Sequence, residues 1–547
     1  MLRLTEVKLP LDHTPEALRA AVLARLGLPG EELLDIHVFR RGYDARKRNA
    51  IQLIYTLDVT LRDEAATLRR FPQDQHVNRT PDMAYRFVAR APEGFANRPV
   101  VIGVGPCGLM AALVLAQMGL RPIILERGKA VRERTKDTWG LWRRSELNPE
   151  SNVQFGEGGA GTFSDGKLYS QIKDPQHHSR KLLEEFVKAG APEEILYLSK
   201  PHIGTFRLVT MVESMRRTIE ELGGEYRFNT KVVDLDIQAT ADGGRQIRGV
   251  MLEDGGYLAA DHVVLAVGHS ARDTFAMLLE RGVFMEAKPF SVGFRIEHPQ
   301  GMIDRCRFGE AAGNPLLGAA DYKLAHHCKG KGLEGRTVYS FCMCPGGTVV
   351  AATSEPGRVV TTGMSQYSRA ERNANAAIVV SVTPADYPGG VLAGLGFQRE
   401  LEERAYQAGG GAYFAPAQTV GDFLANRPST TLGEVVPSYK PGVTPTDLAP
   451  TLPDYAIAAI REALPAFERQ VRGYARPDAV MTGVETRTSS PLRIRRGESG
   501  HSVNTRGLFP AGEGAGYAGG ILSAGVDGIK TAEAVALSLL GDVAQAA

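Results

Sequence analysis

The chain has 547 residues, too many for one ordinary domain, so two or three domains are expected. With 43% apolar and 23% charged residues it reads as globular, and a formal net charge of +2 gives no whole-chain field for nucleic acid or a membrane surface. The five cysteines are odd in number and unevenly spread, which argues against a secreted disulfide framework. No signal-peptide core follows Met1 and no apolar run is long enough to span a bilayer, so a soluble cytoplasmic protein is expected.

Residues 1–95 form a small first block. Apolar alternation predicts strands at 4–12, 33–41 and 50–61, and a 3.6-residue period predicts a helix at 15–28. The block is therefore expected to be a small α+β domain of the ferredoxin-like kind. Its connection RRGYDARKRN, residues 40–49, is basic but interrupted by an aspartate and poor in aromatic residues, which favours a solvated hairpin tip over an RNA-binding patch.

Pro, Gly and Asn mark residues 91–99 as a linker. Strands and helices alternate over 98–285, which predicts an α/β domain. Short strands separated by turns over 286–478 predict a mostly antiparallel substrate or cap domain. Glycine-rich loops and a last helix return over 479–547, which we assign to the C-terminal part of the α/β domain.

The strongest motif lies at residues 98–128, RPVVIGVGPCGLMAALVLAQMGLRPIILERG. Gly103, Gly105 and Gly108 form G-x-G-x-x-G between a buried strand and a helix, and a second strand ends at Glu126. The first glycine permits the tight turn, the second lets a pyrophosphate approach the backbone, and the third lets the helix pack on the strand. The acid can accept hydrogen bonds from ribose and disfavours a 2′-phosphate. The order of these elements predicts a dinucleotide-binding βαβ unit.

Together with this motif, the segments 155–170, 261–273 and 507–534 resemble the glutathione-reductase-like flavoproteins with two dinucleotide-binding domains. KPFSVGFRIEHP, FCMCPGG and GVETRTSSPLRI extend the likeness to the bacterial and plastid-type FAD-dependent dehydrogenases, or oxidoreductases, over most of 98–540. The resemblance implies FAD as the cofactor. The residues that it and the motif assign to FAD are Gly103, Gly105, Pro106, Cys107, Gly108, Glu126, Arg127, Gly159, Ala160, Gly161, Gly268, Gly512, Glu513, Gly519, Gly520 and Ile521.

The second glycine-rich loop also favours FAD over NAD independently of the resemblance. NAD needs one βαβ unit, whereas the flavin end of FAD needs its own support. A helix over 520–539 would direct its N-terminus at the flavin, where negative charge develops on reduction. Glu513 stands where this group commonly has an aspartate, which leaves its contact open.

Flavin chemistry needs few protein groups, and the candidates are Lys167, Tyr517 and Arg295. Ser164 lies near the first of these. Arg369 and Arg487 are further candidates for binding an anionic substrate or covering the pocket. For each arginine a structural ion pair is the favoured alternative.

Cys342 and Cys344 lie in a predicted strand, whose period of two would place both sulfurs on one face. The CxC spacing differs from that of redox CxxC motifs, and a disulfide across it would be strained. We expect the turn 345–347, more than the sulfurs, to line the pocket, and a dithiol relay remains open. With His326, His327 and Cys328 the cysteines match no zinc spacing, so no metal is expected.

The sequence therefore predicts an FAD-dependent oxidoreductase that acts on a small molecule under the cap domain. No second complete G-x-G-x-x-G unit occurs, so the electron donor is either NAD(P)H bound without that motif or a redox protein such as a ferredoxin. Two alternatives stay open: an FAD-containing RNA-binding or RNA-modifying protein, and a flavoprotein with structural FAD that acts as an interaction module. The expected partner is a small-molecule substrate, and neither a nucleic acid nor a membrane is expected to bind.

Overall fold

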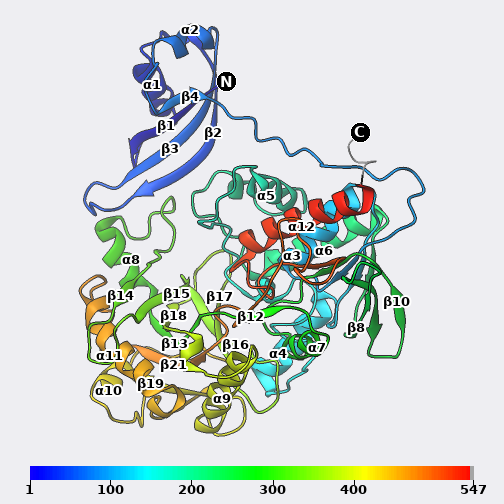
Figure 1. Ribbon diagram of the computed structural model, residues 1–547. Coiled ribbons are helices and arrows are strands. Elements are labelled where there is room, and N and C mark those ends of the chain that lie inside the picture. Colours follow the sequence, from blue (N-terminus) through cyan, green and yellow to red (C-terminus); the bar gives the residue numbers. More distant parts are fainter. Residues whose placement is uncertain (542–547) are drawn as a thin grey trace.

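The computed structural model describes residues 1–541, and Figure 1 shows them as a small N-terminal module beside two larger, adjoining ones. The N-terminal sheet has the strand order β2-β3-β1-β4 with antiparallel neighbours, and helices follow β1 and β3. This is the ferredoxin-like arrangement that the sequence predicted. Its elements are β1 (Leu2–Pro10), α1 (Pro15–Leu26), β2 (Leu33–Asp44), β3 (Gln52–Leu61), α2 (Glu64–Arg69) and β4 (Val77–Arg79).

The β2–β3 hairpin joins this module to the rest of the chain. The backbone of Arg41 exchanges two hydrogen bonds with the loop at Tyr197 and Ser199, at 2.6 and 2.9 Å. Nearer the tip of the hairpin, Ala45 and Ile51 are buried in a cluster with apolar side chains from residues 303–376. Residues 46–50 are exposed. The base of the basic connection is therefore a docking surface, and only its outermost residues form a solvated tip.

A five-stranded parallel sheet, β23-β11-β5-β6-β7, forms the centre of the second module. Four of its strands are apolar and buried, as expected for a parallel sheet covered on both faces, whereas the edge strand β7 is polar and half-buried. Segments far apart in sequence lie side by side here, because β23 comes from the end of the chain. The strands are β5 (Val100–Ile102), β6 (Ile123–Leu125), β7 (Glu225–Arg227), β11 (Val263–Leu265) and β23 (Leu508–Pro510).

Helices α3 and α12 pack together beside this sheet, with α5 and α6 close by (Figure 1). Close approach of the first two depends on Gly528, where a Cβ atom would lie 2.2 Å from the carbonyl oxygen of Cys107. The antiparallel meander β8-β9-β10 completes the module. These elements are α3 (Pro106–Gln117), α4 (Val131–Arg144), α5 (His178–Lys188), α6 (Thr205–Glu221), β8 (Val232–Ala239), β9 (Arg245–Leu252), β10 (Tyr257–Ala259), α7 (Arg272–Glu280) and α12 (Ile521–Leu540).

The cap module contains a seven-stranded sheet, β14-β15-β18-β13-β21-β19-β20, which is antiparallel except at β19–β20. Two hairpin strands, β16 and β17, lie against it. Its elements are β13 (Phe290–Pro299), α8 (Gln300–Phe308), β14 (Ala325–His327), β15 (Thr337–Cys344), β16 (Gly347–Ala351), β17 (Thr361–Ser365), β18 (Asn373–Val382), α9 (Ala393–Ala408), β19 (Ala415–Thr419), α10 (Val420–Leu424), β20 (Val443–Pro445), α11 (Asp454–Glu468) and β21 (Val480–Glu485).

One predicted border differs from the structure. We expected the cap to end at residue 478, but β21 pairs with β13 and β19 and so belongs to the cap sheet. The return to the parallel module passes through a small sheet of β12 (Met285–Ala287) and β22 (Leu492–Ile494). The sequence could not show this, because β21 pairs with a strand almost 190 residues earlier. The last six residues of the predicted C-terminal part lie outside the described range.

Within residues 1–541, no helix combines the length and the apolar character that a membrane crossing requires.

Candidate functional site

A cavity of about 400 Å³ lies where the carboxyl ends of the parallel strands meet the cap. Loops after β5, β6, β11 and β23 line it, together with the 154–170 loop and the start of β8. Phe341, Cys342 and Thr362 of the cap line the same cavity. Ligands of open α/β sheets bind at this edge of the sheet. The cavity is thus shared by the predicted dinucleotide-binding module and the predicted substrate module.

The three fingerprint glycines are needed for different reasons. A Cβ on Gly103 would lie 2.5 Å from the carbonyl oxygen of Ala266, and one on Gly108 would lie 1.9 Å from the carbonyl oxygen of Gly103. A Cβ on Gly105 would meet only the Cα of Gly159, at 3.7 Å. Packing within the protein therefore leaves no room for a side chain at the first and third glycines. The second glycine faces open space at the N-terminus of α3. This is the cradle that a pyrophosphate requires.

Glu126 ends β6 with its side chain buried at the cavity. Its carboxylate accepts hydrogen bonds from the backbone N–H groups of Val104, Gly128 and Gly156, at 3.1, 2.9 and 3.0 Å. It therefore fixes the fingerprint turn to two neighbouring loops. Each carboxylate oxygen can accept more than one hydrogen bond, so ribose hydroxyls can still bind there.

The glycine-rich loop between α4 and α5 is held by one buried arginine. Arg134, fully inaccessible on α4, donates to the backbone carbonyls of Asn152, Val153, Glu157 and Gly159 at 2.6–2.8 Å. The sequence motif singled out the loop but not this arginine, which lies some 20 residues earlier on a helix of ordinary composition.

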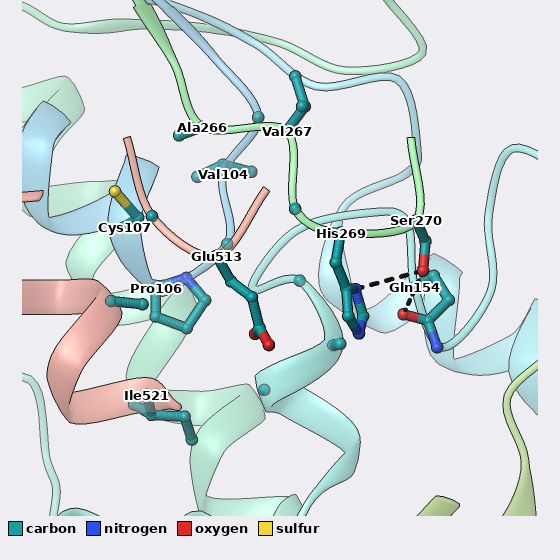
Figure 2. Close-up of a pocket in the computed structure, with 18 of the residues that line it drawn as sticks. Val104, Pro106, Cys107, Gln154, Ala266, Val267, His269, Ser270, Glu513 and Ile521 are labelled. Atoms are coloured by element: carbon teal, nitrogen blue, oxygen red, sulfur yellow. Dashed lines mark hydrogen bonds between the residues drawn. The ribbon is translucent and has the colours of Figure 1, made fainter. Parts of the chain in front are cut away.

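The second glycine-rich loop brings Glu513 to the cavity. Figure 2 shows its carboxylate extending between Pro106 and His269. Burial raises the pKa of Glu513 to about 7, and the more distant charge of Lys288 lowers it only in part. The N-terminus of α12, at Ile521, opens on the same cavity. A carboxyl group and free N–H groups therefore face the space together.

Of the residues that the sequence assigned to FAD, all except Gly108 line this cavity. Gly108 lies behind the turn, where it permits helix packing. The sequence analysis did not name several other lining residues. These are Gln154, Phe155, Thr230, Lys231, Val232, Ser270, Thr274 and Thr488.

The predicted arginines are all held in ion pairs. Arg369 donates to both carboxylate oxygens of Asp165. Arg487 lines the cavity, but its guanidinium is paired with Glu402 at 3.1 Å.

Arg295 was predicted to be catalytic, but its side chain is wholly buried outside the cavity lining. Its Nη1 lies 3.6 Å from Glu485, and its Nη2 donates to the carbonyl of Cys342 at 2.9 Å. Nη2 also lies 3.7 Å from Cys344 Sγ. The reason for this placement is the pattern of β13, which points Arg295 into the space between sheets. The residue can act on the site only through the cysteines.

Of the other two catalytic candidates, one lines the cavity and the other does not. Lys167 lines the cavity, with Nζ 3.4 Å from Asp165 and 4.0 Å from Cys344 Sγ. Burial would lower the pKa of Lys167, but the negative charges of Cys344 and Asp165 outweigh it and raise the pKa. Tyr517 does not line the cavity, which corrects the prediction. Its hydroxyl accepts a hydrogen bond from the backbone N–H of Arg496 at 3.0 Å, and the guanidinium of Arg496 lies over its ring.

The expectation for the paired cysteines was wrong. Cys342 lines the cavity, whereas no residue of the turn 345–347 does. The turn is closed off by its neighbours: a Cβ on Gly346 would lie 1.7 Å from the carbonyl oxygen of Arg369, and one on Gly347 would lie 2.4 Å from that of Met364. The backbone approach that we inferred from the glycines is made to another part of the protein and not to a ligand.

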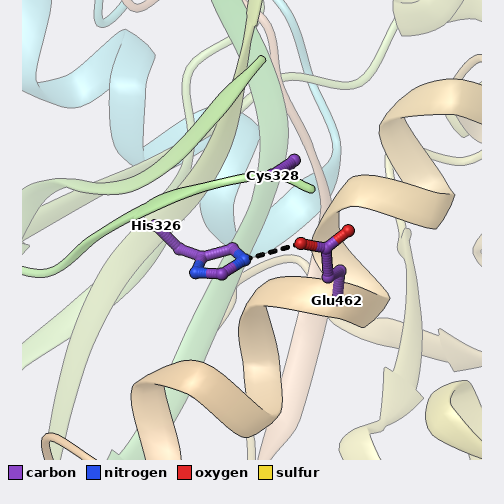
Figure 3. A group of neighbouring side chains, drawn as sticks. All are labelled: His326, Cys328 and Glu462. Atoms are coloured by element: carbon purple, nitrogen blue, oxygen red, sulfur yellow. Dashed lines mark hydrogen bonds and ion pairs between the residues drawn. The ribbon is translucent and has the colours of Figure 1, made fainter. Parts of the chain in front are cut away.

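Three potential metal ligands come together elsewhere in the cap. Ligand atoms of His326, Cys328 and Glu462 lie within 4.8 Å of one another. Figure 3 shows the imidazole and the carboxylate facing each other, and they are hydrogen-bonded at 2.8 Å. Glu462 also accepts from the backbone N–H groups of Lys329 and Gly330. The carboxylate thus already fastens this loop to α11.

Comparisons with known proteins show what the chain is similar to. Residues 289–488 match the family described as FAD-dependent protein, C-terminal domain-like, and residues 1–60 match a domain of unknown function (DUF8436). An uncharacterized protein of Clostridium beijerinckii is 45% identical over 533 residues, which are 97% of this chain and 98% of that protein.

Solved structures resemble the chain only remotely. The halogenase PltM shares 14% identity over 82% of this chain and 70% of its own, with a TM-score of 0.37. The crystal structure of CtdE in complex with FAD shares 11% identity over 80% of this chain and 82% of its own, with a TM-score of 0.28.

FAD is the cofactor of this protein. The residues present suit it, because the open face of Gly105, the N-termini of α3 and α12 and the carboxylate of Glu126 all meet at one cavity. Helix N-termini favour phosphate and reduced flavin, and the acid favours ribose hydroxyls.

Proposed function

This chain belongs to the family of the Clostridium beijerinckii protein and carries the C-terminal domain of FAD-dependent proteins, and on that premise we propose that it is an oxidoreductase acting on a small molecule. The observation that carries the proposal is the continuity of the cavity. The fingerprint turn and the cap residues Phe341, Cys342 and Thr362 line one space. A substrate held by the cap would therefore lie beside the cofactor and not in a separate pocket.

When bound, FAD supplies two-electron chemistry at its isoalloxazine ring. The chain's own residues position the cofactor and set the local charge. Gly105 and the start of α3 would receive the phosphates, while Glu126 would receive the ribose, because all three lie at the cavity. The start of α12 favours negative charge at its end of the cavity.

The cap residues would hold the substrate and exclude water. Lys167 keeps its positive charge in the cavity, because its pKa is raised by the negative groups beside it. Phe341 and Thr362 of the cap line the same cavity. A polar or anionic group of the substrate would be directed toward Lys167.

For the electron donor we propose NAD(P)H or a redox protein such as a ferredoxin, since a single dinucleotide fingerprint occurs. We place the protein in the cytoplasm and propose neither a nucleic-acid nor a membrane partner. Against RNA binding, Arg46 of the basic hairpin is paired with Asp44, and the base of the hairpin is docked.

Anaerobic reduction of the purified protein tests the proposal. We expect a yellow protein whose flavin bands bleach with NADH, NADPH or reduced ferredoxin, or with one member of a metabolite panel. Failure of every donor, with a stable protein partner in a pull-down, would instead indicate structural FAD. Salt-sensitive retention of RNA would point to the nucleic-acid alternative.

A further inference from the structure

We propose that Cys342 and Cys344 form a redox-active thiol pair in the cavity wall, and that the substrate is a disulfide of low molecular weight. This inference rests on the proposed function, since the pair must receive its electrons through the cofactor. Cys342 lines the cavity and Cys344 is fully buried, which suits a small disulfide that can enter the cavity and not the disulfide of a folded protein.

The geometry of β15 brings the pair to the cavity. Pairing with β18 shifts register between Phe341 and Cys344, so a β-bulge interrupts the strand, and Cys342 takes a left-handed φ of +44°. Bulges re-aim side chains, and strained non-glycine backbone of this kind is concentrated at functional sites. In a regular strand the two Cα atoms would lie about 6.7 Å apart, at the limit for a disulfide, and the irregular backbone at Cys342 departs from that geometry. The thiol of Cys344 turns back, with Sγ 3.3 Å from the carbonyl oxygen of Cys342.

The charged side chains around Cys342 and Cys344 favour a negative charge on the two sulfurs. Three cations meet here: Lys167 from the glycine-rich loop, Arg295 from β13 and Arg369 from beyond β17. The carboxylates that pair with them are Asp165 and Glu485. The negative charge of Asp321 also acts on Arg369, but Asp321 is itself paired with Lys200 at 2.6 Å. Three buried positive charges against at most two negative ones favour a thiolate on the cysteine pair.

The two sulfurs divide the charge unequally. A hydrogen bond with Cys344 and the positive charges of Lys167 and Arg295 lower the pKa of the Cys342 thiol to about 6, although burial and Glu485 oppose them. The pKa of Cys344 is raised, first by its bond with Cys342 and then by burial. At neutral pH the pair thus carries one negative charge. Lys167 Nζ and Arg295 Nη2 approach Cys344 Sγ, at 4.0 and 3.7 Å, so this charge belongs to the pair as a whole, and Cys342 is the sulfur that a substrate in the cavity can reach. Cys107 also lines the cavity, but burial and then the charge of Asp527 raise its pKa.

A thiolate beside a second thiol is suited to disulfide exchange. The Cys342 thiolate attacks R–S–S–R, forms a mixed disulfide and releases RS⁻. The Cys344 sulfur then attacks the Cys342 sulfur, and the second R–S leaves with the Cys344 proton as RSH. The substrate gains two electrons and the pair loses two. Two electrons, from one reduced nicotinamide or from two one-electron redox proteins such as reduced ferredoxin, together with one proton would restore the thiolate and the thiol.

The test is reaction of the FAD-loaded protein with excess 4,4′-dithiodipyridine at pH 5.5, followed by release of thiopyridone. At this pH a thiol with a pKa of about 6 should react roughly 20-fold faster than a model peptide thiol, after its lower nucleophilicity is included. We expect two rapid equivalents from the wild type, one from Cys344→Ser, and none at this rate from Cys342→Ser. Cys306→Ser is the matched control and should behave as the wild type. Mass spectrometry should find a bond between residues 342 and 344 in the wild type.

Lys167→Met tests the charge argument without altering either sulfur. It should slow the first equivalent at pH 5.5 but not at pH 9, where both proteins carry the thiolate. Flavin content and circular dichroism check that each variant folds. A single rapid equivalent from the wild type, or fastest reaction at another cysteine, overturns the inference.

The proposed function is judged separately by flavin bleaching in Cys342→Ser. If a donor bleaches the flavin while the thiol pair is unreactive, the oxidoreductase stands and the disulfide substrate fails. If no donor bleaches the flavin of the wild type, the proposed function itself fails.

Discussion

Arg134→Met should loosen the glycine-rich loop of the FAD cavity and weaken FAD binding. The guanidinium is fully buried and donates to four backbone carbonyls at 2.6–2.8 Å. Each hydrogen bond from a charged group is worth about 1.5–3 kcal/mol, and a buried carbonyl left without a donor costs about 1–3 kcal/mol. Because the loop can relax and admit water, we expect a net loss of about 3–5 kcal/mol in the free energy of unfolding.

Two measurements check this expectation. Urea unfolding of the apoprotein gives the loss of stability, and quenching of FAD fluorescence gives the affinity, which should fall by at least about tenfold. Arg144→Met on the same helix is the control, because that side chain is 60% exposed and paired only with Glu146. It should change stability by no more than about 1 kcal/mol. If Arg134→Met matched this control in both measurements, the argument that one arginine holds the loop would be refuted.

The remaining predictions concern the fingerprint, the second loop and the cap. Gly105→Ala should fold normally but lose FAD, because its Cβ meets only one atom, at 3.7 Å, in the protein; Gly108→Ala should lower the melting temperature itself, because its Cβ would lie 1.9 Å from a carbonyl oxygen. Equal melting temperatures of these two variants would contradict the assignment. The pKa of Glu513 is raised to about 7 in the folded protein, so the free energy of unfolding of the apoprotein should fall as pH rises from about 4.5 to 7, and Glu513→Gln should remove this slope in pH-dependent melting. Glu402→Gln should cost about 3–5 kcal/mol in urea unfolding, because it removes the ion-pair partner of the buried Arg487 and leaves the buried Arg272 paired with Glu355 alone; Glu400→Gln, exposed on the same helix, should cost almost nothing.

Much of the cofactor site follows from local sequence. The fingerprint glycines, the helix after them and Glu126 lie within about 25 residues, and their spacing alone fixes their relative positions in a βαβ unit. The last helix was placed in the same way, and its start at Ile521 does line the cavity. The fold of the N-terminal module could also be predicted from the sequence, because its main strands and its first helix each show their own hydrophobic period.

The residues at the catalytic end of the cavity could not be predicted from local sequence. Arg295 and Tyr517 looked alike as candidates, but pairing with Glu485 buries the first, and the second contacts Arg496 outside the cavity lining. The cysteine pair was misjudged because a strand was assumed to be regular. The bulge that turns Cys342 to the cavity is set by its pairing with β18, over 30 residues later.

The sequence by itself determined that a dinucleotide binds and which loops receive it, because the glycines, caps and periods that encode this act over a few residues. Only the tertiary structure decided which charges meet. Lys167, Arg295 and Cys342 come from three segments spread over some 175 residues, and their ionisation depends on distances and burial that no spacing records. The chemistry of the site therefore depends on long-range packing, whereas the position of the cofactor site is encoded by short stretches of sequence.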